Sequence, residues 1–169
     1  MSREKISLAE QAIREERVGR FRSGAERYCA LVERDSLEIR ELLASLLRLV
    51  DLGLRLPDVE PESEFEPSDP DSLQADADAV ARNLRRIIGD IDFYWVVFDP
   101  RSLFSDPSMG SLVDDLVDIY LELRRGLHLA DTGHQVDATW TWRFSMRVHW
   151  GIHATGAIRT LFRVVADEQ

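Results

Sequence analysis

Residues 111–133, SLVDDLVDIYLELRRGLHLADTG, decide the fold of this chain. Apolar side chains recur there every three or four positions, which places them on one face of an α-helix. These residues are Leu112, Leu116, Ile119, Tyr120, Leu123 and Leu127. Ser111 and Asp114 form a capping pair that is typical of a helix N-terminus. The closing Asp131-Thr132-Gly133 predicts a tight turn, so the helix is followed by an antiparallel neighbour.

The second arm of this hairpin is predicted as one long helix over residues 134–165. Three of the four tryptophans lie within residues 140–153, together with two arginines and two histidines. On a continuous helix Trp142 falls on the same face as His149 and His153, because seven residues return close to the same angle. This placement predicts that the two histidines are buried.

Three more helices are predicted upstream, because apolar stripes of helical period run through residues 7–33, 35–56 and 71–89. Gly19 and Gly24 weaken the middle of the helix over residues 7–33, so we expect two helical segments with a joint between them. Asp35 fits an N-cap for the second helix, which should end before Pro57.

The remaining apolar run, FYWVVF at residues 93–98, has the composition of a strand. No second strand pattern is present to pair with it, so we expect a helical turn or a buried connector. The predicted fold class is therefore all-α, an up-and-down bundle of about five helices with a long acidic loop. We expect a helical extension over residues 1–20 and a single bundle domain over residues 21–165.

The net charge of −10 arises from one segment of the chain. No lysine or arginine occurs between Arg55 and Arg82, where nine acidic residues lie, whereas the rest holds 22 acids and 21 bases. Residues 57–70 also contain four prolines and form the predicted acidic loop, with Phe65 as its one anchor. No basic stripe is dense enough for nucleic acid, so we expect no nucleic-acid partner. An acidic segment of this kind can attract a basic surface of another protein or metal cations, and the favoured alternative is a connector that its charge keeps solvated.

The single cysteine and the polar first residues, Met1-Ser2-Arg3-Glu4-Lys5, indicate the cellular compartment, because the chain opens without the apolar stretch of a secretion signal. Cys29 allows neither an intramolecular disulfide nor a zinc site built on cysteines, and we expect a buried structural thiol. The longest apolar run has six residues, far below the roughly 20 that span a bilayer. The chain is therefore predicted to be cytoplasmic, without a membrane partner.

Two pairs of residues could hold a divalent metal ion between the last two predicted helices. His149 and His153 are four positions apart, so their rings lie one above the other. Asp115 and Asp118, continued by Glu122, form an acidic ridge on the preceding helix. If the hairpin pairs these faces, carboxylates and imidazoles converge as in helical metal sites. The alternative is that the acids are solvated and each histidine bonds to a carbonyl or one acid.

A further candidate polar cluster comprises Arg143, Glu122 and Trp142, in which the arginine pairs with an acid of the helix that begins at Ser111 or stacks on a tryptophan. No complete catalytic set appears, and Ser145 lacks the sharp turn that exposes a nucleophile. The leading hypothesis is an accessory or protein-interaction module rather than an enzyme. The alternative is a metal-dependent hydrolase or metal-binding protein.

Three ordered motifs resemble one bacterial family. They are YWVVFDP at residues 94–100, GSLVDDLVDIY at residues 110–120, and WRFS with HWGIH at residues 142–145 and 149–153. The family is catalogued as domain of unknown function five-zero-six-three, and the resemblance covers about residues 21–161. It implies a helical domain of that family and implies no activity, substrate or cofactor.

Overall fold

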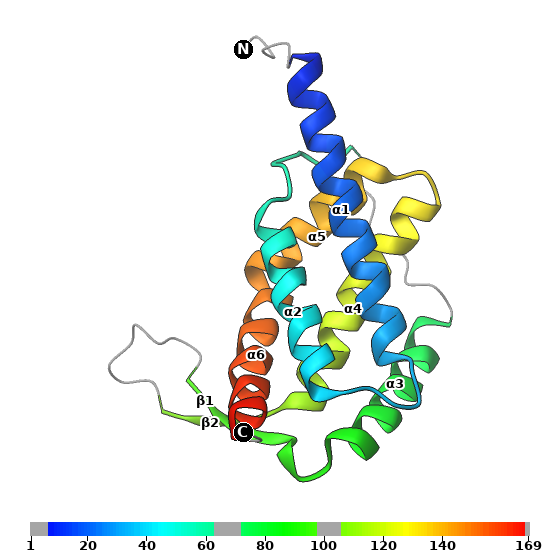
Figure 1. Ribbon diagram of the computed structural model, residues 1–169. Helices are drawn as coiled ribbons and strands as arrows, with labels where there is room; N and C mark the ends of the chain where they lie inside the picture. The colour runs from blue at the N-terminus through cyan, green and yellow to red at the C-terminus, as the bar shows by residue number, and fades with distance from the viewer. Residues whose placement is uncertain (1–6, 63–71, 98–105, 168–169) are drawn as a thin grey trace.

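The computed structural model describes residues 7–62, 72–97 and 106–167. These residues form six α-helices, one short 3-10 helix and a two-stranded sheet (Figure 1). The elements in chain order are α1 (Leu8–Val32), α2 (Ile39–Leu54), α3 (Leu73–Ile88), η1 (Gly89–Ile91), β1 (Phe93–Val96), β2 (Ser108–Ser111), α4 (Leu112–Asp131), α5 (Gln135–Val148) and α6 (Trp150–Asp167). The predicted all-α class is confirmed.

Helix α4 is the centre of the bundle, because it packs against α1, α3, α5 and α6 (Figure 1). Its apolar stripe is buried as the sequence predicts, and Leu116, Ile119 and Leu123 are fully buried. The Ser111 hydroxyl accepts a hydrogen bond from the backbone N–H of Asp114, which confirms the predicted cap. None of the helices in the described ranges combines the length and apolar composition of a membrane span.

Helix α1 is continuous, so the predicted joint in its middle is wrong. Its glycine at the contact with α2 explains why. A Cβ at Gly24 would lie 2.8 Å from Cδ1 of Leu52, so this glycine lets the two helices approach rather than breaking one of them. The N-terminal half of α1 extends beyond the bundle, and every residue from 8 to 17 is exposed (Figure 1).

Helix α2 begins later than predicted. Its N-cap is Glu38, whose side chain makes no capping hydrogen bond, and the expected cap at Asp35 lies four residues from the helix start. The helix ends at Leu54, before Pro57, as predicted. The acidic loop lies outside the described residues from position 63, as does Phe65.

The long helix predicted over residues 134–165 is two helices, α5 and α6, which differ in direction (Figure 1). The break falls at His149, with φ −143° and ψ −88°. No proline lies at the break, but Gly151 follows it by two residues, and a Cβ there would lie 2.2 Å from the Met146 carbonyl oxygen. The bend allows Trp142 and Trp150, on either side of it, to be fully buried in the core. The Trp150 indole N–H donates to the Trp142 carbonyl at 3.1 Å.

Residues 93–96 form a strand, so the prediction of a turn or connector is wrong. β1 pairs antiparallel with β2, whose sequence Ser-Met-Gly-Ser has no strand-like alternation. Gly110 stands opposite Tyr94 in this register, and a Cβ there would lie 3.1 Å from the tyrosine ring. The strand pairing therefore depends on a close approach that composition does not reveal.

Candidate metal centre

Helix α4 presents three carboxylates toward the start of α6. Asp115, Asp118 and Glu122 follow one another at i, i+3 and i+7, a spacing that keeps them on one side of the helix. Asp115 is the deepest, with 7% of its surface exposed. Its burial next to the apolar stripe makes it a partner for α6 rather than a solvated surface acid.

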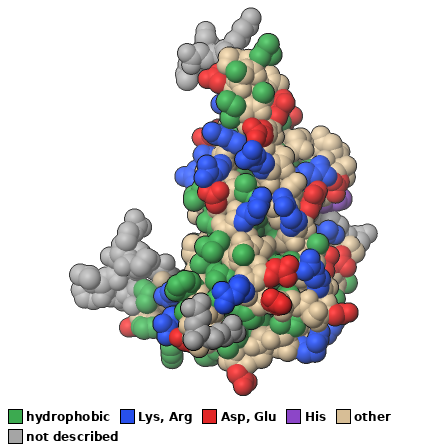
Figure 2. Space-filling model, in the orientation of Figure 1, with side chains coloured by type: hydrophobic (Ala, Val, Ile, Leu, Met, Phe, Trp, Pro, Cys, Tyr) green, Lys and Arg blue, Asp and Glu red, His purple; other side chains and the backbone are tan. Residues whose placement is uncertain are grey.

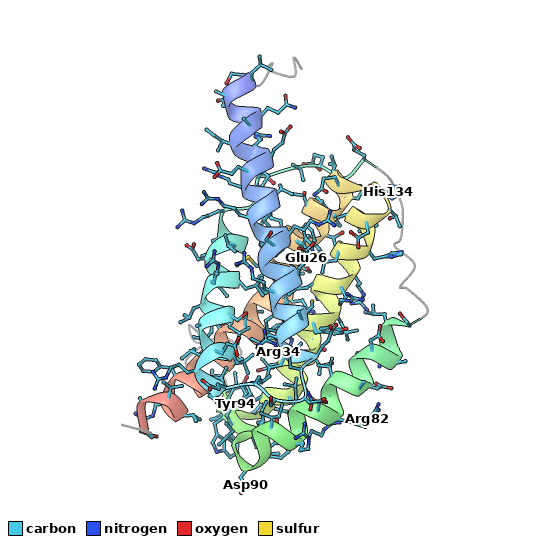
Figure 3. The ribbon with its side chains drawn as sticks, turned by 45° about the vertical axis from the view of Figure 1, so that its right-hand side comes forward. Glu26, Arg34, Arg82, Asp90, Tyr94 and His134 are labelled. Carbon is cyan, nitrogen blue, oxygen red and sulfur yellow. The ribbon has the colours of Figure 1, made fainter. Side chains whose placement is uncertain are left out.

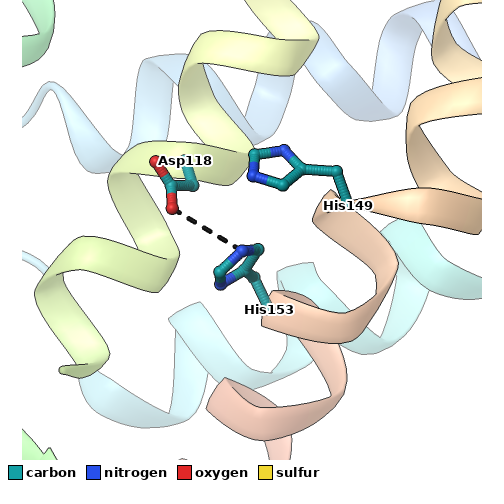
Figure 4. A group of neighbouring side chains, drawn as sticks. All are labelled: Asp118, His149 and His153. Carbon is teal, nitrogen blue, oxygen red and sulfur yellow. Dashed lines mark ion pairs between the residues drawn. The ribbon is translucent and has the colours of Figure 1, made fainter. Parts of the chain in front are cut away.

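His153 on α6 lies between two of these carboxylates. Its Nδ1 is 2.7 Å from Oδ1 of Asp115, and its Nε2 is 3.6 Å from Oδ2 of Asp118 (Figure 4). A carboxylate only accepts hydrogen bonds, so Nδ1 carries the proton that is donated to Asp115. In the neutral ring this leaves a lone pair on Nε2, which is directed at Asp118.

His149 stands at the break between α5 and α6 and faces the same carboxylates. Its Nδ1 is 3.4 Å from Oε1 of Glu122, and its ring lies 4.8 Å from that of His153 between centroids. The candidate ligand atoms of Asp118, His149 and His153 all lie within 4.8 Å of one another (Figure 4). The break in the helix therefore brings the second imidazole into the group.

Burial and neighbouring charges shift the pKa values of His153 and Asp118. The hydrogen bond with Asp115 raises the pKa of His153, because it stabilises the protonated ring. Burial raises the pKa of Asp118, since it disfavours the charged carboxylate, although the two histidines act against this. Asp115, Asp118 and Glu122 carry three negative charges when ionised, and Arg125, which pairs with Glu122 at 2.9 Å, offsets one of them. The group therefore stays net negative when both rings are neutral.

Tyr94 is a site residue that the sequence did not reveal. Its hydroxyl donates a hydrogen bond to Oδ2 of Asp115, so the aspartate is held by His153 on one oxygen and by the tyrosine on the other. Burial raises the pKa of Tyr94 well above its usual range, which keeps the hydroxyl protonated as a donor. Figure 3 shows Tyr94 at the end of the bundle opposite His134. Only the strand pairing places it there.

A cavity of about 300 Å³ adjoins the group and is bordered by the sheet, α4 and the start of α6. Apolar side chains from Val96, Val148 and Ile152 form part of its wall. Asp118, His149 and His153 line the same cavity. A small molecule or water in this space could therefore reach a cation held by these residues.

The other predicted polar cluster does not form as a unit. Glu122 lies beside His149, but Trp142 is fully buried in the core, where its indole N–H donates to the Leu123 carbonyl at 3.2 Å. Arg143 pairs instead with Asp58 at 2.6 Å, in the segment that follows α2. The expectation of an acid from α4 as its partner is wrong. The prediction that both histidines are buried is also wrong, since His149 and His153 are half-buried.

The raised pKa of His153 predicts a pH dependence of stability in chelator-treated protein. The native state binds this proton more tightly than the unfolded state, so the contribution is full below the unfolded pKa of about 6.5 and is lost as the pH rises through the native pKa. The Tm difference between the unmodified chain and His153→Gln should therefore shrink from about pH 6 to about pH 9. Calorimetry with EDTA measures it, and a difference that grows with pH would contradict the expectation.

Comparison with known proteins identifies relatives of the fold. The family model described as Domain of unknown function (DUF5063) matches residues 13–167. Among solved structures, the chain is similar to protein BF1032 from Bacteroides fragilis, with a TM-score of 0.73 and 20% identity over 89% of this chain and 92% of that chain. No curated protein matches. At this identity the structural likeness shows a shared fold and nothing about activity.

Proposed function

The chain belongs to the DUF5063 family, and we propose that it binds a divalent transition-metal ion, Zn²⁺ foremost, through Asp118, His149 and His153. The observation that carries this proposal is the convergence of their ligand atoms within 4.8 Å. Zinc ligands lie about 2.0–2.2 Å from the ion, which separates two of them by about 3.4 Å in a tetrahedron. Small side-chain rotations are therefore sufficient to close the site.

The hydrogen bonds behind the rings support this assignment. Histidine ligands commonly donate their other ring N–H to a carboxylate, which sets the tautomer and makes the ligand nitrogen more basic. Here Asp115 takes this position behind His153, and Glu122 lies 3.4 Å from Nδ1 of His149. Asp115 thus acts as an orienting residue in the proposal, although the sequence suggested it as a ligand.

The donor set favours a transition metal over Mg²⁺ or Ca²⁺. Two imidazoles with one carboxylate suit Zn²⁺ and its first-row neighbours, whereas Mg²⁺ and Ca²⁺ prefer oxygen ligands throughout. Three protein ligands would also leave a fourth position open toward the 300 Å³ cavity. Water bound at that position would be the nucleophile that a metal-dependent hydrolase requires. A hydrolase function would therefore require that the metal binds first.

Metal binding predicts a large thermal shift in protein freed of metal by chelation. Ligand at about 100 times its Kd stabilises the native state by about 2.7 kcal/mol, which raises the Tm of a chain of this size by about 5–10 °C. Zn²⁺ should produce this shift and Mg²⁺ should produce little. Melts over a metal series, with elemental analysis of the purified protein, measure the effect.

Variants separate the site from unspecific binding. Asp118→Asn and His149→Ala should abolish the Zn²⁺ shift, because each removes one of three ligands. His128→Ala is the matched control, since this histidine lies outside the group near the end of α4 and should keep the shift. The absence of a shift with Zn²⁺, Mn²⁺ or Co²⁺, with no metal in the purified protein, would end the proposal.

A second candidate function is an accessory or protein-interaction module in the cytoplasm. It is favoured by the N-terminal half of α1, which extends from the bundle with every residue from 8 to 17 exposed. An isolated helical segment of this length is marginally stable in water, so a partner surface would stabilise it. The buried Cys29, whose pKa is raised by desolvation, is an inert structural thiol in keeping with a reducing compartment.

A further inference from the structure

Helices α1 and α2 enclose a groove that is rich in arginine. Two neighbouring cavities of about 460 and 620 Å³ lie between these helices, and they share residues of both helices along their walls. Five arginines line this arginine groove: Arg17, Arg20, Arg27, Arg48 and Arg55. Arginine side chains gather over α1 in the middle of the view in Figure 2, with acids between them.

The charges in the arginine groove are only partly paired. Arg20 pairs with Glu16 at 2.5 Å, and Arg55 pairs with Asp51 at 2.7 Å. Neither Arg17 nor Arg48 forms an ion pair with any acid of residues 7–62, 72–97 or 106–167. Five arginines and two carboxylates give the groove a net charge of +3, in a chain whose net charge is −10.

The groove also offers apolar contact along its length. Ile13 is 48% exposed on the projecting half of α1, and Leu52 lies on the facing side of α2. A ligand here would meet guanidinium groups beside aliphatic surface, with Glu16 and Asp51 between them. Glu16 and Asp51 interrupt the row of arginines, so a phosphate backbone, with a charge on every nucleotide, would place some charges beside them. A polypeptide can place its carboxylates at the arginines and uncharged residues beside Glu16 and Asp51, so it fits better than a nucleic acid.

We propose that the arginine groove docks an acidic peptide segment of a partner protein. Carboxylates of the segment would bind the forks of Arg17 and Arg48, which match a carboxylate in two parallel hydrogen bonds. Apolar side chains of the segment would pack on Ile13 and Leu52. This inference rests on the proposed interaction function and names its surface and partner class, and it is independent of the metal site.

A fluorescein-labelled peptide in which glutamates alternate with leucines tests the proposal by fluorescence anisotropy with the full chain. We expect saturable binding that weakens as salt is added, because exposed charges are screened. The double variant R17E/R48E should weaken the Kd about tenfold or more, since it replaces two attractive charges with repulsive ones. Both residues are exposed, so the variant should melt like the unmodified chain.

Controls make the outcome specific to the arginine groove. R82E changes an exposed arginine on α3, away from α1 in Figure 3, and should leave the Kd unchanged. Equal binding by R17E/R48E, equal binding of a peptide with glutamine for glutamate, or tighter binding of a labelled single-stranded oligonucleotide would overturn the proposal. If a pull-down from native lysate recovers a stoichiometric partner equally with R17E/R48E, the interaction function stands and the groove assignment fails.

Discussion

Replacing Trp142 by alanine is expected to lower the free energy of unfolding by about 3–5 kcal/mol. The side chain is fully buried and packs on Phe21 with ring centroids 5.1 Å apart. Gly126 leaves room for the indole, because a Cβ there would lie 2.0 Å from its Nε1. The loss of the ring would leave a cavity among α1, α4 and α5, and the Leu123 carbonyl would lose the indole N–H that donates to it.

Urea denaturation followed by circular dichroism measures this loss, with the midpoint and slope fitted together. Trp95→Ala is the matched control, since Trp95 is 70% exposed on β1 and its truncation should change the stability by less than about 0.5 kcal/mol. A loss below about 1 kcal/mol at Trp142 would contradict a core role and indicate an exposed surface instead.

Replacing Gly151 by alanine is expected to destabilise the chain by about 3 kcal/mol and to impair the candidate metal centre. A Cβ at this position would lie 2.2 Å from the carbonyl oxygen of Met146. That atom belongs to the backbone, so the contact is relieved only by moving α5 against α6. The same movement would displace His149, which stands at the break between them.

The measurement combines urea denaturation with the Zn²⁺ thermal shift on one variant. Gly19→Ala is the control, because a Cβ there meets nothing within 4 Å on an exposed face of α1. It should stabilise the chain by about 0.5–1 kcal/mol, since alanine favours helix more than glycine does. Wild-type stability and an unchanged Zn²⁺ shift in Gly151→Ala would show that the break tolerates a side chain.

The helices that follow a simple stripe were predictable from sequence, because helical periodicity is a local property of the chain. The apolar face of α4 and its Ser111 cap are recognisable within one stretch of about 20 residues. The same reasoning failed at Gly24, where the glycine allows close packing with α2. A glycine that breaks a helix and one that admits a neighbour have the same signature in sequence.

The candidate site was predictable only as two pairs of residues on neighbouring elements. The spacing of Asp115 and Asp118 places that pair on one side of α4. The same expectation for His149 and His153 assumed one continuous helix, whereas His149 stands at the break before α6. The division of roles was not predictable: Asp115 lies behind His153, whereas Asp118 faces it. The contribution of Tyr94 depends on strand pairing with a segment that has no strand pattern of its own.

The sequence by itself determined an all-α bundle built on the 111–133 hairpin, its family, and the residue types available for a metal. Only the tertiary structure decided where the predicted helix over residues 134–165 breaks into α5 and α6. That break also decides that His153 faces Asp115 and Asp118 and that His149 faces Glu122. The physical reason is the burial of Trp142 and Trp150, whose packing turns the chain at His149. This packing involves residues from several helices that are far apart in sequence. The backbone break that it imposes at His149 therefore cannot be predicted from the local spacing of residues.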